Sequence, residues 1–131
     1  MKVLLPEGWP RPGGYSNGIE TGAGRLVFIA GMVGWDEQGA FHSDDLVDQF
    51  RQVLVNTKAV MAEGGATPEH MVRMTWYITD KQDYLSRLKD IGATYRDVMG
   101  RNYPAMACVQ VTALIEDRAR IEIETTCVVE N

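Results

Sequence analysis

The chain has 131 residues, of which 45% are hydrophobic and 24% charged, and its formal net charge is −5. A chain of this length can build one hydrophobic core, so we expect a single domain over residues 1–131. The thirteen Lys and Arg residues are scattered and form no basic stripe, which argues against nucleic acid as a partner.

The N-terminal segment and the cysteines indicate where in the cell the protein is found. Only three apolar residues lie between Lys2 and Pro6, too few for a signal peptide, and no apolar run reaches membrane-spanning length. Cys108 and Cys127 lie in strand-like apolar segments, where a reduced, buried thiol is the commonest state. Neither has the Cys/His spacing of a zinc site. We therefore expect a cytoplasmic protein with no metal and no membrane partner.

The first half of the chain predicts loops, one strand and one helix. Residues 6–24 contain three prolines and six glycines, which indicates loops around at most one short strand near residues 15–20. The apolar run 25–31 predicts a buried strand. A helix follows, capped by Ser43 and ended by Gly64 and Gly65. Its buried stripe recurs at three- and four-residue steps and consists of Leu46, Phe50, Val53, Leu54, Thr57, Val60 and Met61.

The second half predicts a strand, a helix and two further strands. Over residues 72–79 the apolar side alternates with polar residues and comprises Val72, Met74, Trp76 and Ile78. Asp80 caps the second helix, which ends at Gly100 and has a stripe of Tyr84, Leu88, Ile91, Tyr95 and Val98. Two last strands, 105–114 and 118–129, are joined by a turn at 115–117, and this short connection favours direct antiparallel pairing.

This order of elements predicts an α+β fold. Right-handed crossovers would place both helices on the same side of a mixed sheet. Two helices cannot cover both sides, so one sheet face is left bare, and we expect Met, Thr, Tyr and Cys residues on it beside a few charges. Such a face is most easily hidden by self-association around a symmetry axis. We therefore expect a homo-oligomer.

The last third of the chain carries a recognisable pattern. Residues 101–111 read RNYPAMACVQV, and residues 119–124 read ARIEIE. This pair of segments resembles the signature of the reactive intermediate deaminase (Rid, YjgF-like) family, in which an aromatic-Pro-Ala-Arg segment precedes a strand with Ile-Glu alternation. Residues 14–16, the strand end at Ala30-Gly31 and residues 49–56 also match family landmarks, so the resemblance covers about residues 13–129.

The resemblance implies a chorismate-mutase-like fold assembled as a homotrimer, with a pocket at each subunit interface. It implies hydrolysis of reactive enamines or imines to keto acids and ammonia, without a metal or an organic cofactor. Glu122 matches the family glutamate near the attacking water, although a solvated strand carboxylate is the alternative. The pocket positions also include Tyr15 at the entrance and a floor formed by Ala30, Gly31, Ala107 and Cys108. Cys108 as a nucleophile is a weaker alternative than a small buried thiol, because it has no assignable base.

Three positions depart from the family pattern. In deaminating members an arginine follows Pro-Ala and binds the substrate carboxylate through two charge-assisted hydrogen bonds. Here that residue is Met106, whose thioether is at most a weak acceptor. Met32 stands where a polar residue is common, and Gly92 stands where asparagine is frequent. The pocket is therefore expected to be more apolar than usual.

An anionic ligand would then need another cation. Arg73 is the candidate, because it lies mid-strand among apolar residues where an unpaired cation is costly, although a structural salt bridge also explains it. Arg96 and Arg101 are the alternatives at a helix end. Trp35 and Trp76 could stack on an unsaturated ligand, but Trp76 lies on the apolar side of its strand and suits the core.

Three functions remain open at this stage. The first is a small-molecule deaminase or related hydrolase with altered specificity, for example one similar to the 2-aminomuconate deaminases. The second is a ligand-binding or regulatory trimer that has lost imine hydrolysis. The third is an endoribonuclease, a name carried by some relatives, against which the acidic charge balance argues.

Overall fold

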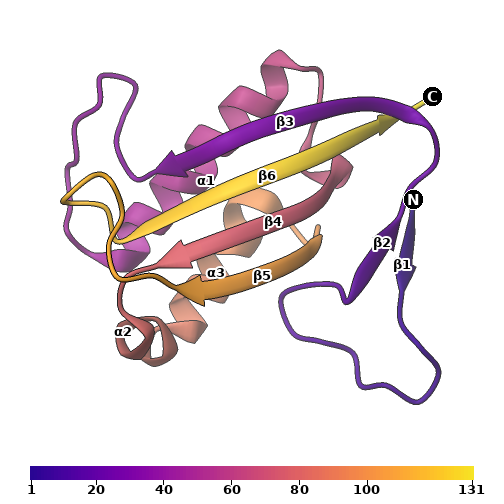
Figure 1. The fold of residues 1–131 in the computed structure, drawn as a ribbon, viewed down its shortest axis with the longest axis horizontal. Coiled ribbons are helices and arrows are strands. Elements are labelled where there is room, and N and C mark those ends of the chain that lie inside the picture. Colours follow the sequence, from indigo (N-terminus) through magenta and orange to yellow (C-terminus); the bar gives the residue numbers. More distant parts are fainter.

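A four-stranded sheet forms the centre of the protein. The computed structural model describes residues 1–131. The strands are β3 (Gly24–Val33), β4 (Met71–Ile78), β5 (Ala105–Gln110) and β6 (Ile121–Glu130). Their order across the sheet is β3-β6-β4-β5, in which β6 is antiparallel to both of its neighbours and β4 is parallel to β5 (Figure 1). The predicted mixed sheet is therefore confirmed.

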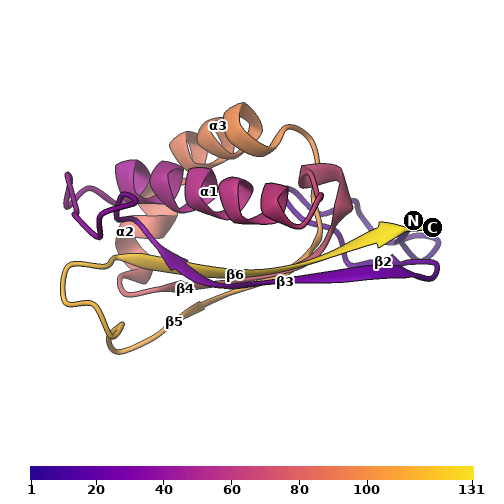
Figure 2. The same ribbon diagram turned by 90° about the horizontal axis from the view of Figure 1, so that it is seen from above.

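The helices lie on one side of this sheet, as predicted. They are α1 (Leu46–Glu63), α2 (Lys81–Ser86) and α3 (Leu88–Met99), with a short 3-10 turn, η1, at Pro68–His70. Figure 2 shows α1 close above the sheet and α3 farther from it, with the opposite face uncovered. None of the helices has both the length and the apolar composition needed to cross a membrane.

The start of α1 differs from the prediction by two residues. Asp45, not Ser43, is the N-cap, and its carboxylate accepts hydrogen bonds from the backbone N–H groups of Val47 and Asp48. Ser43 instead donates to the Asp48 carboxylate at 2.8 Å. A carboxylate at this position also interacts with the positive end of the helix dipole, which explains why it replaces the hydroxyl as the cap.

The buried side of α1 contains a polar residue that periodicity did not reveal. Gln49 is fully buried, and its amide donates to the carbonyls of Ser43 and Arg118 at 3.0 and 2.9 Å. Its side-chain oxygen accepts from the Arg120 N–H at 2.7 Å. Gln49 therefore fastens α1 to the loop that leads into β6. Val60, predicted to be buried, is exposed instead.

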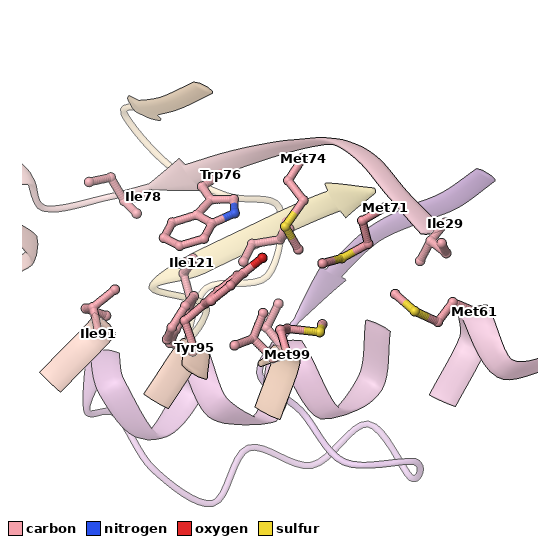
Figure 3. Close-up of a cluster of buried hydrophobic side chains, with 14 of the residues drawn as sticks. Ile29, Met61, Met71, Met74, Trp76, Ile78, Ile91, Tyr95, Met99 and Ile121 are labelled. Carbon is pink, nitrogen blue, oxygen red and sulfur yellow. The ribbon is translucent and has the colours of Figure 1, made fainter. Parts of the chain in front are cut away.

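The second predicted helix is broken in two. Asp80 caps α2, as predicted, but the chain bends at Arg87 before α3 begins. Because of this bend, Leu88 is 49% exposed while Met99 is buried, so the buried stripe of α3 consists of Ile91, Thr94, Tyr95 and Met99. Figure 3 shows Ile91, Tyr95 and Met99 pointing from α3 towards Met74, Trp76 and Ile78 on β4.

The predicted antiparallel pairing of the last two strands is wrong. Strand β5 ends at Gln110, and the loop 111–120 then carries the chain past β4 before β6 begins. β4 lies between β5 and β6 and pairs with both. The reason is that β5 is joined to β4 by the α2–α3 crossover, which fixes them as parallel neighbours.

Three smaller differences concern the strands. A bulge at Val72 means that Met71, rather than Val72, belongs to the buried set of β4. β3, predicted as a buried strand, is an edge strand with one exposed face. A two-stranded ribbon that the sequence indicated only in part, β1 (Lys2–Leu4) with β2 (Gly18–Glu20), precedes it.

The uncovered sheet face is more polar than predicted. Methionines and cysteines do not lie on it, because Met74, Met106, Cys108 and Cys127 all face the helices. Thr75, Tyr77, Glu122 and Glu124 do lie on the uncovered face, as the strand registers require. Two large apolar side chains of β3 join them, Leu26 and Phe28, of which Phe28 is 72% exposed. Self-association through this face stays a prediction.

We expect Phe28→Glu to dissociate the oligomer, because it places a charge where apolar side chains of neighbouring copies would meet. Light scattering after size-exclusion chromatography should give a trimer for the wild type and a smaller species for Phe28→Glu. Val60→Glu, a matched change on the exposed side of α1, should stay trimeric. A monomeric wild type at micromolar concentration would refute this arrangement.

A second expectation concerns Gln49. Gln49→Ala removes three hydrogen bonds and leaves backbone groups of the loop unpaired in the interior, so the free energy of unfolding should fall by roughly 2 to 4 kcal/mol. Urea denaturation followed by circular dichroism measures this. Gln52→Ala, which removes one hydrogen bond to Asn56 on the same helix, should cost less than about 1 kcal/mol. Equal losses would contradict the role of Gln49.

Candidate functional site

A cleft opens between α3 and the edge of the sheet at β5. It has a volume of about 350 Å³ and seven of its eleven lining residues are hydrophobic. Met106 lines it from β5, where it pairs in register with the buried Met74 of β4. Gly92 lines it from α3, so two of the three departures from the family pattern meet here. The remaining residues are Gly13, Gly14, Trp76, Tyr84, Leu88, Ile91, Tyr95, Arg96 and Tyr103.

Aromatic rings hold α3 away from the sheet and so shape this cleft. Phe50, Trp76, Tyr95 and Tyr103 form a continuous series, with ring centroids 4.9, 6.1 and 5.4 Å apart in that order. The Tyr95 hydroxyl donates to the carbonyl of Asn102, and burial raises the pKa of Tyr95 above its ordinary value. The series therefore fixes the wall of the cleft from core to rim.

Arg96 is the one charged residue that lines the cleft. A Cβ atom built on Gly92 would lie 3.3 Å from Nη1 of Arg96, so the guanidinium lies directly over this glycine. The two residues are one helical turn apart, and helical side chains lean towards the N-terminus. From the sequence, Arg96 is only an alternative to Arg73 as the cation. Its four-residue spacing from Gly92 is the signal that could single it out.

Cys108 lies beside Tyr84 near this cleft. Burial raises the pKa of the Cys108 thiol, and the hydroxyl of Tyr84 partly opposes that effect. Burial, followed by the proximity of Cys108, raises the pKa of Tyr84 to about 12. Both groups are therefore neutral at physiological pH, which suits a packed wall better than a nucleophile.

Glu122 and Gly31 form a second group at the opposite edge of the sheet. A Cβ atom on Gly31 would lie 2.4 Å from Oε2 of Glu122, so the carboxylate occupies the space above this glycine. Glu122 pairs with Val33 on β3 and Tyr77 on β4 and faces the uncovered side. Its carboxylate makes no hydrogen bond or ion pair within the chain, unlike that of Glu124, which accepts from the Tyr77 hydroxyl at 2.7 Å. Met32 follows Gly31 and packs against the core.

Arg73 lies on the uncovered face and away from Met106. It lines a shallow hollow with Ala30, Thr75 and Glu124. Phe28 and Ile29 also line this hollow, but Arg73 is exposed and forms no salt bridge, so solvent offsets the cost expected for an unpaired cation. Ala107 faces the same side, opposite Thr75 in the parallel register.

Tyr15 lines a third cavity, of about 400 Å³, beside the N-terminal ribbon. Ser16 anchors this segment, because its N–H donates to the Pro104 carbonyl at 3.0 Å. The cavity includes Arg101 and shares Gly14 and Tyr103 with the cleft, so the two are adjacent. Trp35 lines none of these cavities and instead packs against Phe41, with ring centroids 5.8 Å apart.

One protomer does not bring all the predicted site residues together. Met106, Gly92 and Cys108 meet on the helix side of β5, whereas Glu122 and Gly31 meet on the uncovered side near β3. Strands β5 and β3 are separated by two strands, which places them on the order of 14 Å apart. The predicted pocket floor therefore cannot form within a single chain. No three His, Cys, Asp or Glu side chains converge as metal ligands would.

Comparison with known proteins finds relatives that match nearly the whole chain. The family model described as endoribonuclease L-PSP matches residues 10–129. A RutC family protein of Pyrococcus horikoshii is 35% identical over 125 residues, which cover 94% of each chain. The 2-iminobutanoate/2-iminopropanoate deaminase of Salmonella typhimurium is 29% identical over 131 residues, covering 97% of each chain. The crystal structure of the Rid-family protein YyfB of Yersinia pestis, of unknown function, is 34% identical, with a TM-score of 0.83 over 98% of each chain.

We expect both thiols to react slowly in the native protein. Burial raises the pKa of Cys127 to about 11 and also raises that of Cys108, so the thiolate fraction at pH 7.5 is lower than in a free thiol. Alkylation by iodoacetamide at that pH, followed by mass spectrometry, should be at least about ten-fold slower than for free cysteine. The difference should vanish in urea. If Cys108 in the native protein reacts faster than free cysteine, the hypothesis that it is a nucleophile is supported instead.

Proposed function

Because this chain belongs to the Rid family, whose model is described as endoribonuclease L-PSP, we propose that it hydrolyses the C=N bond of small imines or enamines. The products would be a carbonyl compound and ammonia. Hydrolysis of this kind requires a water molecule aimed at the imine carbon and a group that moves its proton. The proposal rests mainly on the unpaired carboxylate of Glu122.

Glu122 is suited to proton transfer by its surroundings. Its carboxylate stands over Gly31, where no side chain competes for the space, and it has no partner within the chain. A water molecule held there could pass a proton to the carboxylate as its oxygen bonds to the imine carbon. Return of that proton to nitrogen gives a carbinolamine. Transfer of the hydroxyl proton to nitrogen, again through the carboxylate, then forms the C=O bond, breaks the C–N bond and releases ammonia. No atoms other than those of the imine and one water are consumed.

The site would be completed by a neighbouring protomer. One half-site, with Met106 and Gly92, lies at the β5 edge of the sheet. The other joins Glu122 on the interior strand β6 to Gly31 on the edge strand β3. In a ring of three protomers the β5 edge of one can adjoin the β3 edge of the next, which would close each cleft over a carboxylate. A homotrimer with an intersubunit pocket is therefore part of the proposal.

Substrate specificity is proposed to differ from that of typical deaminating members. Met106, Leu88 and Ile91 give the cleft an apolar wall, which favours imines with an apolar or unsaturated side chain. The deaminase from Salmonella typhimurium is named for 2-iminobutanoate and 2-iminopropanoate, and both are short imino acids. 2-Aminomuconate stays a hypothesis to be tested beside them.

A second candidate is a ligand-binding or regulatory trimer without catalysis. Met106 favours it, because this side chain cannot make the charge-assisted contacts that the family arginine supplies. If Met106→Arg gains hydrolysis that the wild type lacks, the methionine is the reason for the loss. An endoribonuclease is the third candidate, and the net charge of −5 argues against it.

The test couples an amino-acid oxidase, which generates imines, to semicarbazone formation, which reports how long they survive. We expect the wild type to shorten the lifetime of 2-iminobutanoate and related imines. Glu122→Gln should lower the rate about 100-fold or more, because general acid–base catalysis contributes that much or more. Glu124→Gln is the matched control two residues away on the same face, and it should retain most of the activity.

The same assay can contradict the proposal in two ways. No acceleration by the wild type across several imines, 2-aminomuconate included, would favour the binding trimer. Equal loss in Glu122→Gln and Glu124→Gln would assign the effect to the charge of the face rather than to Glu122.

A further inference from the structure

We infer that Arg96 binds the carboxylate of the ligand and so replaces, from α3, the arginine that this chain lacks at position 106. The inference rests on the proposed function, because it names the anchor of the same site. It concerns the cleft beside β5, where Met106, Gly92 and Arg96 meet.

The guanidinium of Arg96 has unused donors. It forms no ion pair and no hydrogen bond within the chain, and its side chain is exposed. Arg11, Arg73 and Arg101 are unpaired as well, so Arg96 is distinguished by its place in the cleft beside Met106. The remaining arginines serve the fold. Those donate to carboxylates or backbone carbonyls and are Arg25, Arg51, Arg87, Arg118 and Arg120.

Gly92 creates the place that the guanidinium occupies. Because Nη1 of Arg96 lies 3.3 Å from where a Cβ would be, a Cβ at position 92 would require the guanidinium to shift by a few tenths of an ångström. An asparagine, which the family pattern often has there, would take up more of this space. Gly92 therefore leaves room for a cation in the cleft where Met106 stands in place of the arginine.

The surroundings would strengthen an anionic contact at this point. No acidic side chain lines the cleft, so the positive charge is not cancelled locally. The other walls are apolar and aromatic, and a low local dielectric strengthens the attraction between a guanidinium and a carboxylate. A planar guanidinium also presents two parallel donors to both carboxylate oxygens.

The apolar walls define the rest of the ligand. Leu88, Ile91 and Met106 line the cleft beside its one guanidinium, so the body of the ligand should be apolar or unsaturated. The ligand class is therefore a small monocarboxylate with such a body.

The test measures the binding of oxo acids, which are products and need no hydrolysis to bind. Isothermal titration calorimetry would compare 2-oxobutanoate with its neutral amide, 2-oxobutanamide. We expect the wild type to bind the carboxylate roughly ten-fold or more tightly than the amide. In Arg96→Met the affinity for 2-oxobutanoate should fall about 10- to 100-fold, while that for the amide should barely change.

Two variants serve as controls. Lys89→Met removes the same charge from the same helix but from a residue outside the cleft, and it should bind both compounds as the wild type does. The double variant Arg96→Met with Met106→Arg returns a guanidinium to the cleft from β5 and should restore the preference for the carboxylate. This exchange also guards against the possibility that Arg96→Met acts by disturbing the fold.

Gly92→Ala gives a readout that a structural role of Arg96 would not produce. Alanine in a helix interior should raise the midpoint of thermal unfolding by a few degrees. At the same time its Cβ should push the guanidinium aside and weaken 2-oxobutanoate binding several-fold. Higher stability with lower affinity is the expected combination.

Three outcomes would overturn the inference. They are undiminished binding of 2-oxobutanoate by Arg96→Met, an equal loss in Lys89→Met, and a wild type with no preference for the carboxylate over the amide. Because binding is measured without turnover, a wild type that hydrolyses no imine but binds through Arg96 refutes only the proposed reaction. Imine hydrolysis that is equally fast in the wild type and in Arg96→Met refutes only the role of Arg96 as the anchor.

Discussion

The parallel pairing of β4 with β5 is the constraint on which the rest of the structure depends. Parallel neighbours require a crossover, and here the crossover is α2 and α3. This places α3 beside the β5 edge on the helix side. The same register turns Met106 and Cys108 towards α3 together with Met74 and Trp76. The cleft and its composition therefore follow from one strand pairing.

The sheet order also divides the chemistry of the chain between two edges. β6 and β4 occupy the interior positions, and each carries its apolar residues to the helices and its charges to the uncovered face. Glu122 thus faces away from the cleft that holds Met106. Under the proposed function each protomer therefore holds two half-sites. The uncovered face, with the exposed Phe28 on it, gives a physical reason for the proposed assembly, which would bring the edges of different protomers together.

Much of the fold could be predicted from local patterns. The wrong predictions concern features that depend on contacts between residues far apart in the sequence. Asp80 as a cap and the inward side of β4 follow from capping chemistry and from period-two alternation. The pairing of β5 with β6 could not be inferred from a short turn, because the longer-range crossover fixed β5 beside β4 first. Gln49 was missed for a related reason. Periodicity recognises apolar burial, whereas this amide is buried to satisfy backbone groups of a loop 69 to 71 residues away.

The choice of the cation in the candidate site also depends on contacts that the sequence does not reveal. The sequence shows that an arginine is absent from position 106, but not which cation offsets that absence, because the candidates Arg73, Arg96 and Arg101 look alike in sequence. Three-dimensional placement separates them: Arg73 lies on the uncovered face, Arg101 in the neighbouring cavity and Arg96 over Gly92 beside Met106. A glycine in a helix interior costs about 0.5 to 1 kcal/mol relative to alanine. At position 92 the glycine leaves free the space over which the guanidinium of Arg96 lies, and the proposed ligand contact would explain why that cost is accepted.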